Sequence, residues 1–371
     1  MSRLSAPVQV GSTPLEHRIA LAPLTRLRCN DKWAPTELTK EYYEQRADAP
    51  GTLLITEATF ISRSAASALN VGGIWEEKQV SAWRDVTEAV HAKGSKIFCQ
   101  LSHEGRAGDV AVLEAGGFSL LSSSAVPIDS EHATPKEMTE DDILEVIADF
   151  VKAAKNAIAA GFDGVEIQGA NGYLLDQFIQ YTCNKRGDRW GGTIENRVRF
   201  PLEVVKAVSN AIGADKTGLR LSPYSNYLGM GMDFPVPTFH YLLENLKPLG
   251  LAYLSLVEAR ISGDKESCCG NQATVRWMVE YWNNTSPVII GGGFTPETAL
   301  LAVEETYHSF DVIIAFGRRF ISNPDLVKRV QTGEPLVRYD TSSFYLVQSP
   351  KGYTDYPFNQ KILDGNVVRV F

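Results

Sequence analysis

Short apolar runs alternate with amphipathic segments along this chain of 371 residues, and that alternation restricts the possible folds more than any other feature. Most of the runs are rich in leucine or β-branched residues and are bounded by Gly or Pro, which is typical of strands buried on both faces. The predicted strands number eight: residues 18–23, 52–57, 96–101, 164–167, 217–221, 252–256, 288–291 and 312–316.

Helical spacing of apolar residues fills the intervals between these runs. Residues 77–92 carry valine and tryptophan at close to a helical period. Thr139 and Asp142 resemble a capping box with acidic first-turn residues, which predicts a helix over residues 143–160. The other predicted helices span residues 39–48, 194–212, 238–246, 275–282, 296–306 and 324–330.

Strand–helix alternation repeated eight times predicts an α/β fold, a (β/α)8 TIM barrel. A doubly wound sheet is the alternative, but the absence of a composition break or linker favours the barrel. We expect one domain over residues 1–371, with a long loop at 105–136 after the third strand that covers or shapes a site. The aromatic tail, residues 340–371, is expected to pack back onto the barrel.

Composition disfavours several classes of partner. Hydrophobic residues make up 44% of the chain, which supports a full core, and the net charge is −8 without any Lys/Arg run. That balance disfavours nucleic acid and anionic membranes. No stretch approaches the roughly 20 apolar residues of a membrane span, and the first residues lack the apolar segment of a signal peptide. We therefore expect a cytoplasmic monomer or homodimer whose partner is a small molecule.

The five cysteines show no spacing typical of a metal site, so we expect no structural metal. Cys99 lies in an apolar run and is interpreted as a small core residue. The adjacent Cys268 and Cys269 leave two interpretations open, a redox pair and a chance pairing in a loop.

A cluster of polar side chains directly follows the fourth predicted strand. Gln168 and Asn171 supply neutral amide donors, and Tyr173 supplies a phenolic acid. In a barrel, functional residues gather at the carboxyl ends of the strands, so this cluster is a candidate active site. A structural alternative for Tyr173 is a buried phenol that caps a loop.

Glycines and arginines follow the seventh and eighth predicted strands. Gly292 and Gly293 permit close approach of backbone N–H groups to an anion, while Gly317 precedes Arg318 and Arg319. The loops after these two strands are the usual phosphate site of the barrel. Each glycine cluster alone could be a turn, and their joint position favours a phosphate site.

Arg220 lies inside the apolar fifth strand, where a charged side chain needs a partner. A structural ion pair and a cofactor contact are both open, and the predicted phosphate site favours the second. Gln100, in the third strand, could bond a polar ring edge, and Thr25 offers a hydroxyl after the first.

Several blocks of the sequence match the old yellow enzyme family in order and over nearly the whole chain. They are Ala22-Pro-Leu-Thr25-Arg26, Thr56-Glu-Ala58, Gln100-Leu101 with Gly105-Arg106, residues 169–178, residues 188–197, Gly291-Gly-Gly293 and Phe316-Gly-Arg318. The resemblance implies an FMN-dependent ene-reductase on a TIM barrel. NAD(P)H would reduce the flavin, and hydride would then pass to the β-carbon of an α,β-unsaturated carbonyl compound.

The resemblance also implies a role for each site residue. The FMN phosphate would be held by Gly292, Gly293, Gly317 and Arg318. The flavin ring system would contact Pro23, Leu24, Thr25, Ala58, Gln100 and Arg220, with Arg220 at the pyrimidine edge and ribityl region. On the substrate side, Gln168 and Asn171 would bind the carbonyl oxygen, Tyr173 would act as general acid, and Tyr345 would lie over the pocket.

Two positions depart from the family pattern. Gln168 replaces a usual His, so its amide still donates but cannot become cationic. Ser102 replaces a common Trp and is expected to widen the substrate pocket. The next residue, His103, is interpreted as a loop residue with an ordinary backbone hydrogen bond rather than a catalytic group.

Residues 222–231 and 352–358 are similar to fungal members, in particular to ergot-pathway enzymes that act on chanoclavine aldehyde. Reductases of that branch keep the tyrosine that Tyr173 matches, and isomerases lack it. The main hypothesis is therefore an ene-reductase in fungal secondary metabolism. A redox-neutral flavin-dependent isomerase or cyclase is the alternative, and a flavin-binding scaffold without catalysis is a third.

Overall fold

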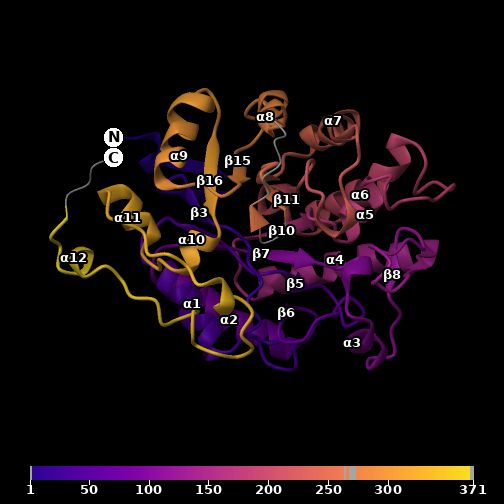
Figure 1. Ribbon diagram of the computed structural model, residues 1–371, viewed down its shortest axis with the longest axis horizontal. Coiled ribbons are helices and arrows are strands. Elements are labelled where there is room, and N and C mark those ends of the chain that lie inside the picture. Colours follow the sequence, from indigo (N-terminus) through magenta and orange to yellow (C-terminus); the bar gives the residue numbers. More distant parts are fainter. Residues whose placement is uncertain (1, 263–264, 267–272, 368–371) are drawn as a thin grey trace.

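The strands close into a barrel in this computed structural model, which describes residues 2–262, 265–266 and 273–367 (Figure 1). All eight barrel strands run parallel, and β10 pairs with both β7 and β11, so the sheet has no break. This confirms the predicted (β/α)8 barrel over the doubly wound sheet. The strands are β3 (Ile19–Leu21), β4 (Leu53–Ile55), β7 (Lys96–Ser102), β10 (Gly164–Gly169), β11 (Thr217–Leu221), β12 (Tyr253–Val257), β15 (Val288–Gly291) and β16 (Val312–Phe316).

β10 is longer than the sequence indicates, and the extension is the part that reaches the candidate site. Gln168 and Gly169 continue the strand past residue 167 because they pair in register with Arg220 and Leu221 of β11. Gln168 is therefore held by strand pairing and does not belong to the following loop. The predicted bounds of β11, β15 and β16 agree with the structure.

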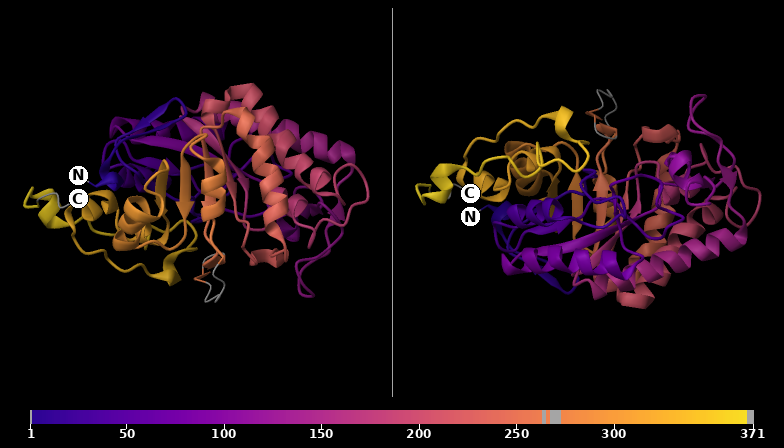
Figure 2. Two further views of the ribbon diagram at one scale, coloured as in Figure 1. Left: turned by 90° about the horizontal axis from the view of Figure 1, so that it is seen from above. Right: turned by 90° about the horizontal axis from the view of Figure 1, so that it is seen from below.

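Helices cover the outside of the barrel (Figure 2). Thr139 caps α4 by accepting a hydrogen bond from the Asp142 backbone N–H at 3.2 Å, so this helix begins at Glu140, three residues before the predicted start. The predicted helix over residues 296–306 changes to a π-helical turn at Ala302–Thr306. The main helices are α1 (Glu37–Arg46), α2 (Glu77–Ala92), α4 (Glu140–Ala159), α6 (Ile194–Ile212), α7 (Pro235–Leu246), α8 (Arg276–Trp282), α9 (Pro296–Leu301) and α11 (Leu326–Thr332).

The core has two layers. One fills the space between the strands and the helices, and a second lies inside the barrel, where Phe98 and Tyr253 are fully buried. A hairpin of β1 (Val8–Val10) and β2 (Thr13–Leu15) packs its valine and leucine side chains against this inner layer. It closes the end at which the strands begin, so the site can open only at the other end. The sequence reasoning did not predict this hairpin.

Shorter elements decorate the connections. The long loop after β7 is tied down by Arg106, whose guanidinium donates to the carbonyl oxygens of Val126, Pro127 and Leu228 at 2.9–3.1 Å. The short strands are β5 (Thr59–Phe60), β6 (Gly72–Gly73), β8 (Leu121–Ser122), β9 (Lys136–Glu137), β13 (Ile261–Ser262) and β14 (Lys265–Glu266). The short helices are α3 (Val110–Glu114), α5 (Leu174–Ile179), α10 (Arg318–Ile321) and α12 (Gln360–Leu363).

The tail packs back on the barrel as predicted, over its described part to residue 367. In Figure 1 it passes beside α1, and the rings of Tyr42 and Tyr353 stack with centroids 4.2 Å apart. Cys99 is fully buried, which confirms its place in the core. Cys268 and Cys269 lie outside the described residues. Among the helices of the described chain, none is long and apolar enough to cross a membrane.

Candidate active site

A large pocket lies at the ends of the barrel strands and gathers nearly all the predicted site residues. About 1270 Å³ of space lies between its walls, a figure that includes solvent at the open mouth. The predicted residues that line it are Pro23, Leu24, Thr25, Ala58, Gln100, Gln168, Asn171, Tyr173, Arg220, Gly292, Gly293, Gly317, Arg318 and Tyr345.

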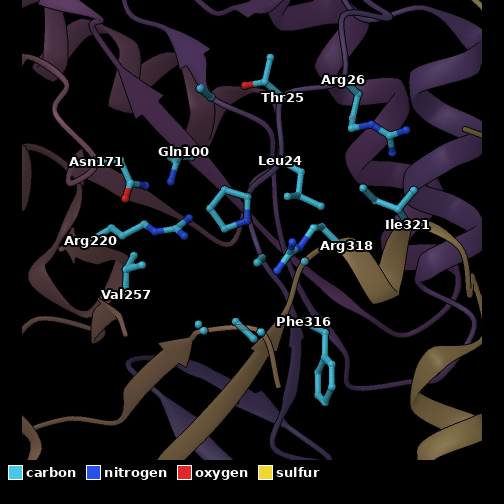
Figure 3. A pocket seen from close by; sticks show the side chains of 18 of the residues that line it. Leu24, Thr25, Arg26, Gln100, Asn171, Arg220, Val257, Phe316, Arg318 and Ile321 are labelled. Atoms are coloured by element: carbon cyan, nitrogen blue, oxygen red, sulfur yellow. The ribbon is translucent and has the colours of Figure 1, made fainter. Parts of the chain in front are cut away.

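Figure 3 shows how the polar groups divide around this pocket. Gln100, Asn171 and Arg220 gather on one side, and Arg318 lies across from them beside Leu24. The first group comes from β7, β11 and the loop after β10, and Arg318 begins α10 after β16. The pocket thus has a polar wall from the middle of the barrel and a charged wall from its last strand.

The loop that carries Asn171 and Tyr173 is tightly constrained. Asn171 adopts the left-handed conformation with φ of 57°, and its backbone N–H donates to Ser222 Oγ at 2.6 Å. Gly172 follows with φ of 77°, and its N–H donates to the buried Asp176 carboxylate at 2.9 Å. Two consecutive left-handed residues turn the chain sharply, which brings both side chains to the pocket.

Gln168 enters the pocket from the end of β10. Its side chain is 5% exposed, and its Oε1 is buried without a hydrogen-bond partner among the described residues. A buried amide oxygen without a partner is unfavourable, so this oxygen has acceptor capacity left for a donor group of a ligand.

Tyr173 is the residue before α5 and is half-buried against the pocket. Burial raises the pKa of its phenol well above the usual value, and the nearby Glu104 carboxylate raises it further. The hydroxyl therefore stays protonated at neutral pH and can act as a proton donor.

Arg220 and Gln100 share a buried partner that the sequence reasoning missed, Glu166. Gln100 Nε2 donates to Glu166 Oε1 at 2.7 Å, and the same carboxylate opposes the lowering of the Arg220 pKa by burial. Glu166 is fully buried in β10, two residues before Gln168 and thus on the same face of the strand. An acidic residue in phase with Gln168 inside an apolar run was the signal that could have revealed it.

The glycines after β15 line the pocket with backbone alone. A Cβ atom at Gly292 would lie 2.6 Å from Cβ of Glu258, so only glycine fits there. Gly293 has φ of 68°, and Gly317 precedes Arg318 at the end of β16. Both Arg318 and Arg319 line the pocket beside these glycines.

The tail forms the remaining wall through Phe344 and Tyr345, which line the pocket together with Tyr227. An arginine clamp, defined by Arg26 and Arg28, fixes it there. Arg26 Nε and Arg28 Nη1 both donate to the Phe344 carbonyl oxygen, at 3.1 and 2.7 Å. Arg28 also donates to the carbonyl oxygens of tail residues 343, 349 and 351 at 2.9–3.0 Å.

The predictions for Ser102, which ends β7, and for His103, which follows it, have different outcomes. Ser102 is fully buried, pairs with Phe60 of β5 and does not line the pocket, so its predicted role in the substrate wall stays a prediction. His103 accepts the Gly105 backbone N–H through Nδ1 at 3.0 Å, and burial lowers its pKa to about 4. Its interpretation as a loop residue with a backbone bond is confirmed.

The residues present fit FMN. Arg220 Nε is buried without a hydrogen-bond partner in the described part of the chain, which suits a polar ring edge. The glycine positions and Arg318 suit a phosphate. Pro23, Leu24 and Ala58 supply an apolar surface for a flat ring between them.

Comparisons with known proteins agree with this geometry. The sequence model of the NADH:flavin oxidoreductase / NADH oxidase family matches residues 3–336. A chanoclavine-I aldehyde reductase of Penicillium roqueforti is 50% identical over 97% of each chain. A probable inactive reductase of Epichloe festucae var. lolii is 46% identical, over 98% of this chain and 97% of its own. The crystal structure of an old yellow enzyme from a Pichia species superposes with a TM-score of 0.89 at 38% identity, over 96% of this chain and 94% of that one.

Proposed function

The chain belongs to the old yellow enzymes of the NADH:flavin oxidoreductase / NADH oxidase family, and we propose that it is an ene-reductase for α,β-unsaturated aldehydes or ketones. It is an oxidoreductase with FMN as cofactor and NAD(P)H as reductant. When bound, FMN would supply the transfer of hydride from the nicotinamide to the β-carbon of the substrate. The fungal relatives suggest a substrate from secondary metabolism.

One observation carries the proposal: two amides and a phenol that stays protonated line the same pocket as the flavin-binding groups. Asn171 and Gln168 are the candidate donors to the substrate carbonyl oxygen, and Tyr173 is the candidate proton source. A pocket with only Arg220 and the glycines would bind a flavin without activating a carbonyl compound.

The two amides would act on charge that develops during the reaction. As hydride reaches the β-carbon, negative charge moves to the carbonyl oxygen, and donors already aimed at that oxygen stabilise it. Loss of one such donor commonly costs about 3–4 kcal/mol of transition-state stabilisation. The backbone of Asn171 is held by its bond to Ser222 and that of Gln168 by its strand register, so neither backbone must move to bind the substrate.

Tyr173 would complete the reduction. Its hydroxyl gives a proton to the α-carbon of the substrate, and the raised pKa keeps that proton in place until the carbon accepts it. The resulting phenolate is then neutralised from solvent through the open mouth of the pocket. The product carries two more hydrogen atoms than the substrate.

A redox-neutral isomerase or cyclase is the second candidate. Gln168 supports it because a glutamine polarises a carbonyl oxygen less strongly than a cationic histidine. A relative of similar identity is named a probable inactive reductase, so reductase activity is not uniform among relatives. Tyr173 favours reduction, since isomerisation needs no net delivery of hydride and proton.

Product mass separates the two. The purified protein is incubated without oxygen with NADPH and a panel of bulky enals and enones. Ene-reduction predicts NADPH consumption equal to product, with the product mass raised by two hydrogens. Conversion at unchanged mass without net NADPH consumption would replace the proposal with the isomerase. NADPH bleaching of the flavin without any conversion would leave a flavin-binding protein without this activity.

A further inference from the structure

We propose that Glu166 is a positioning residue of the flavin site, which orients the Gln100 amide and balances the charge of Arg220. This inference depends on FMN binding and not on the identity of the substrate. Neither Glu166 nor its contacts take part in the reaction steps proposed above.

Glu166 determines the orientation of the Gln100 amide. A carboxylate can only accept hydrogen bonds, so the contact of 2.7 Å to Glu166 Oε1 must come from the amide nitrogen of Gln100. That leaves Gln100 Oε1 as an acceptor for the pocket. The register supports the contact, because Glu166 lies directly across from Gln100 in the pairing of β10 with β7.

Glu166 also balances the positive charge of Arg220. Arg220 keeps its proton in any protein environment, and burial of that charge is unfavourable without a nearby anion. Glu166 is the acidic group that acts on Arg220: burial raises the pKa of its carboxyl group, and the charge of Arg220 opposes that rise. No ion pair within 4.0 Å joins them among the described residues, so the guanidinium is balanced by Glu166 without being tied to it. Arg220 can then present its N–H groups to the pocket (Figure 3).

The second carboxylate oxygen of Glu166, Oε2, accepts no hydrogen bond from Gln100. Glu166 Oε2 is buried without a hydrogen-bond partner in the described chain, and the side chains of Tyr253 and Ser255 face it. A group with a spare acceptor deep in the barrel is costly to keep for packing alone, since an apolar residue would fill the same space. Its two dependents, Gln100 and Arg220, both line the pocket.

Gln100 and Arg220 together present complementary hydrogen-bonding groups to the pocket. Gln100 offers an acceptor and Arg220 offers donors, side by side, which suits a ring edge that alternates one N–H group with carbonyl oxygens. The pyrimidine part of a flavin has that chemistry. The negative charge of Glu166, next to these two residues, would also destabilise the additional negative charge of reduced flavin.

The test uses the holoenzyme and its apoprotein, with Glu166→Gln and Glu166→Asp. Glu166→Gln removes the charge, so reduced flavin should gain at least tenfold in stability relative to oxidised flavin, an upward shift of the potential of about 30 mV. Oxidised FMN, titrated into apoprotein by fluorescence, should bind at least threefold more weakly. Glu166→Asp keeps the charge but is too short to reach Gln100, so FMN binding should weaken while the potential moves less than in Glu166→Gln.

Asp325→Asn is the matched control. Asp325 is an equally buried acid, paired with Arg329 at 2.6 Å on α11, and neither residue lines the pocket. Its loss should lower the melting temperature and leave potential and FMN affinity unchanged. The double variant with Gln100→Leu should show non-additive effects on FMN affinity, because Glu166 acts on the ring partly through Gln100. The proposal would be overturned if, in both Glu166 variants, the FMN affinity and the stability of reduced relative to oxidised flavin stayed within twofold of wild type. Strict additivity of the effects on FMN affinity in the double variant would also overturn it.

Discussion

Replacement of Gly172 by alanine tests whether the sharp turn between Asn171 and Tyr173 sets the geometry of the site. Gly172 has φ of 77°, a conformation that costs a residue with a side chain roughly 1–2 kcal/mol. The added Cβ would also lie 2.8 Å from Cβ of Leu228 and 2.9 Å from the carbonyl oxygen of Tyr227. To reach an ordinary contact, the loop must move by about 0.6 Å.

That displacement acts on both neighbours of Gly172 at once. A misplacement of about 1 Å in a reacting group can lower the rate about 100-fold, so we expect roughly a tenfold fall in turnover of the unsaturated substrate. NADPH reduction of the flavin and FMN affinity should change less than twofold, because Arg220, Gln100 and the glycines near α9 are on other elements. Anaerobic stopped-flow measures the two half-reactions separately.

Gly250→Ala is the control for the backbone conformation alone. Gly250 has φ of 71°, and an added Cβ would meet no described atom within 4 Å. Both variants should lose the same stability from the left-handed conformation, and only Gly172→Ala should lose more and lose turnover. Equal melting temperatures and equal turnover in the two variants would refute the claim that crowding at Gly172 aligns Asn171 and Tyr173.

Three further outcomes are expected. Tyr173→Phe should slow reduction of the unsaturated substrate by about 100-fold or more and leave flavin reduction by NADPH intact, because only substrate reduction uses the phenol; equal slowing of both half-reactions in stopped-flow would count against this role. The pKa of Tyr173 is raised, so its donor form persists to higher pH than in a free tyrosine. Substrate reduction at saturating substrate should therefore be flat up to about pH 10, and a decline that begins near neutral pH would assign the proton to another group. Gln168→His should raise the turnover of small enones several-fold below pH 6, where the imidazole is cationic; unchanged kcat and KM would remove Gln168 from the activating pair.

The barrel could be predicted from the sequence because its strands are buried on both faces and so form continuous apolar runs. β11, β15 and β16 agree to the residue, since glycine, proline or a helix start bounds each of them. The β1–β2 hairpin was missed because its strands have three residues each, too few for a period to appear.

In the site too, residues that are close in the sequence could be predicted, and contacts between distant residues could not. Gln168, Asn171 and Tyr173 are close in sequence, so their convergence on one pocket followed from the motif. Glu166 was absorbed into an apolar run, and its partners Gln100 and Arg220 lie on strands far away in the sequence.

The arginine clamp required the same long-range information, as did the position of Ser102. The clamp joins residues near the first strand to the tail, and no local pattern reports such a contact. Ser102 lies beside β5 because β7 continues one residue past its predicted end at 101 and pairs there with Phe60.

The arginine clamp also determines when the site can first exist during synthesis. The tail carbonyl groups that Arg28 holds come between 315 and 323 residues later in the chain. Once all eight strands have left the ribosome, the flavin side of the pocket can form while Phe344 and Tyr345 are still to emerge. The nascent barrel can therefore bind FMN before its substrate pocket is complete. The tail, which emerges last, then completes that pocket.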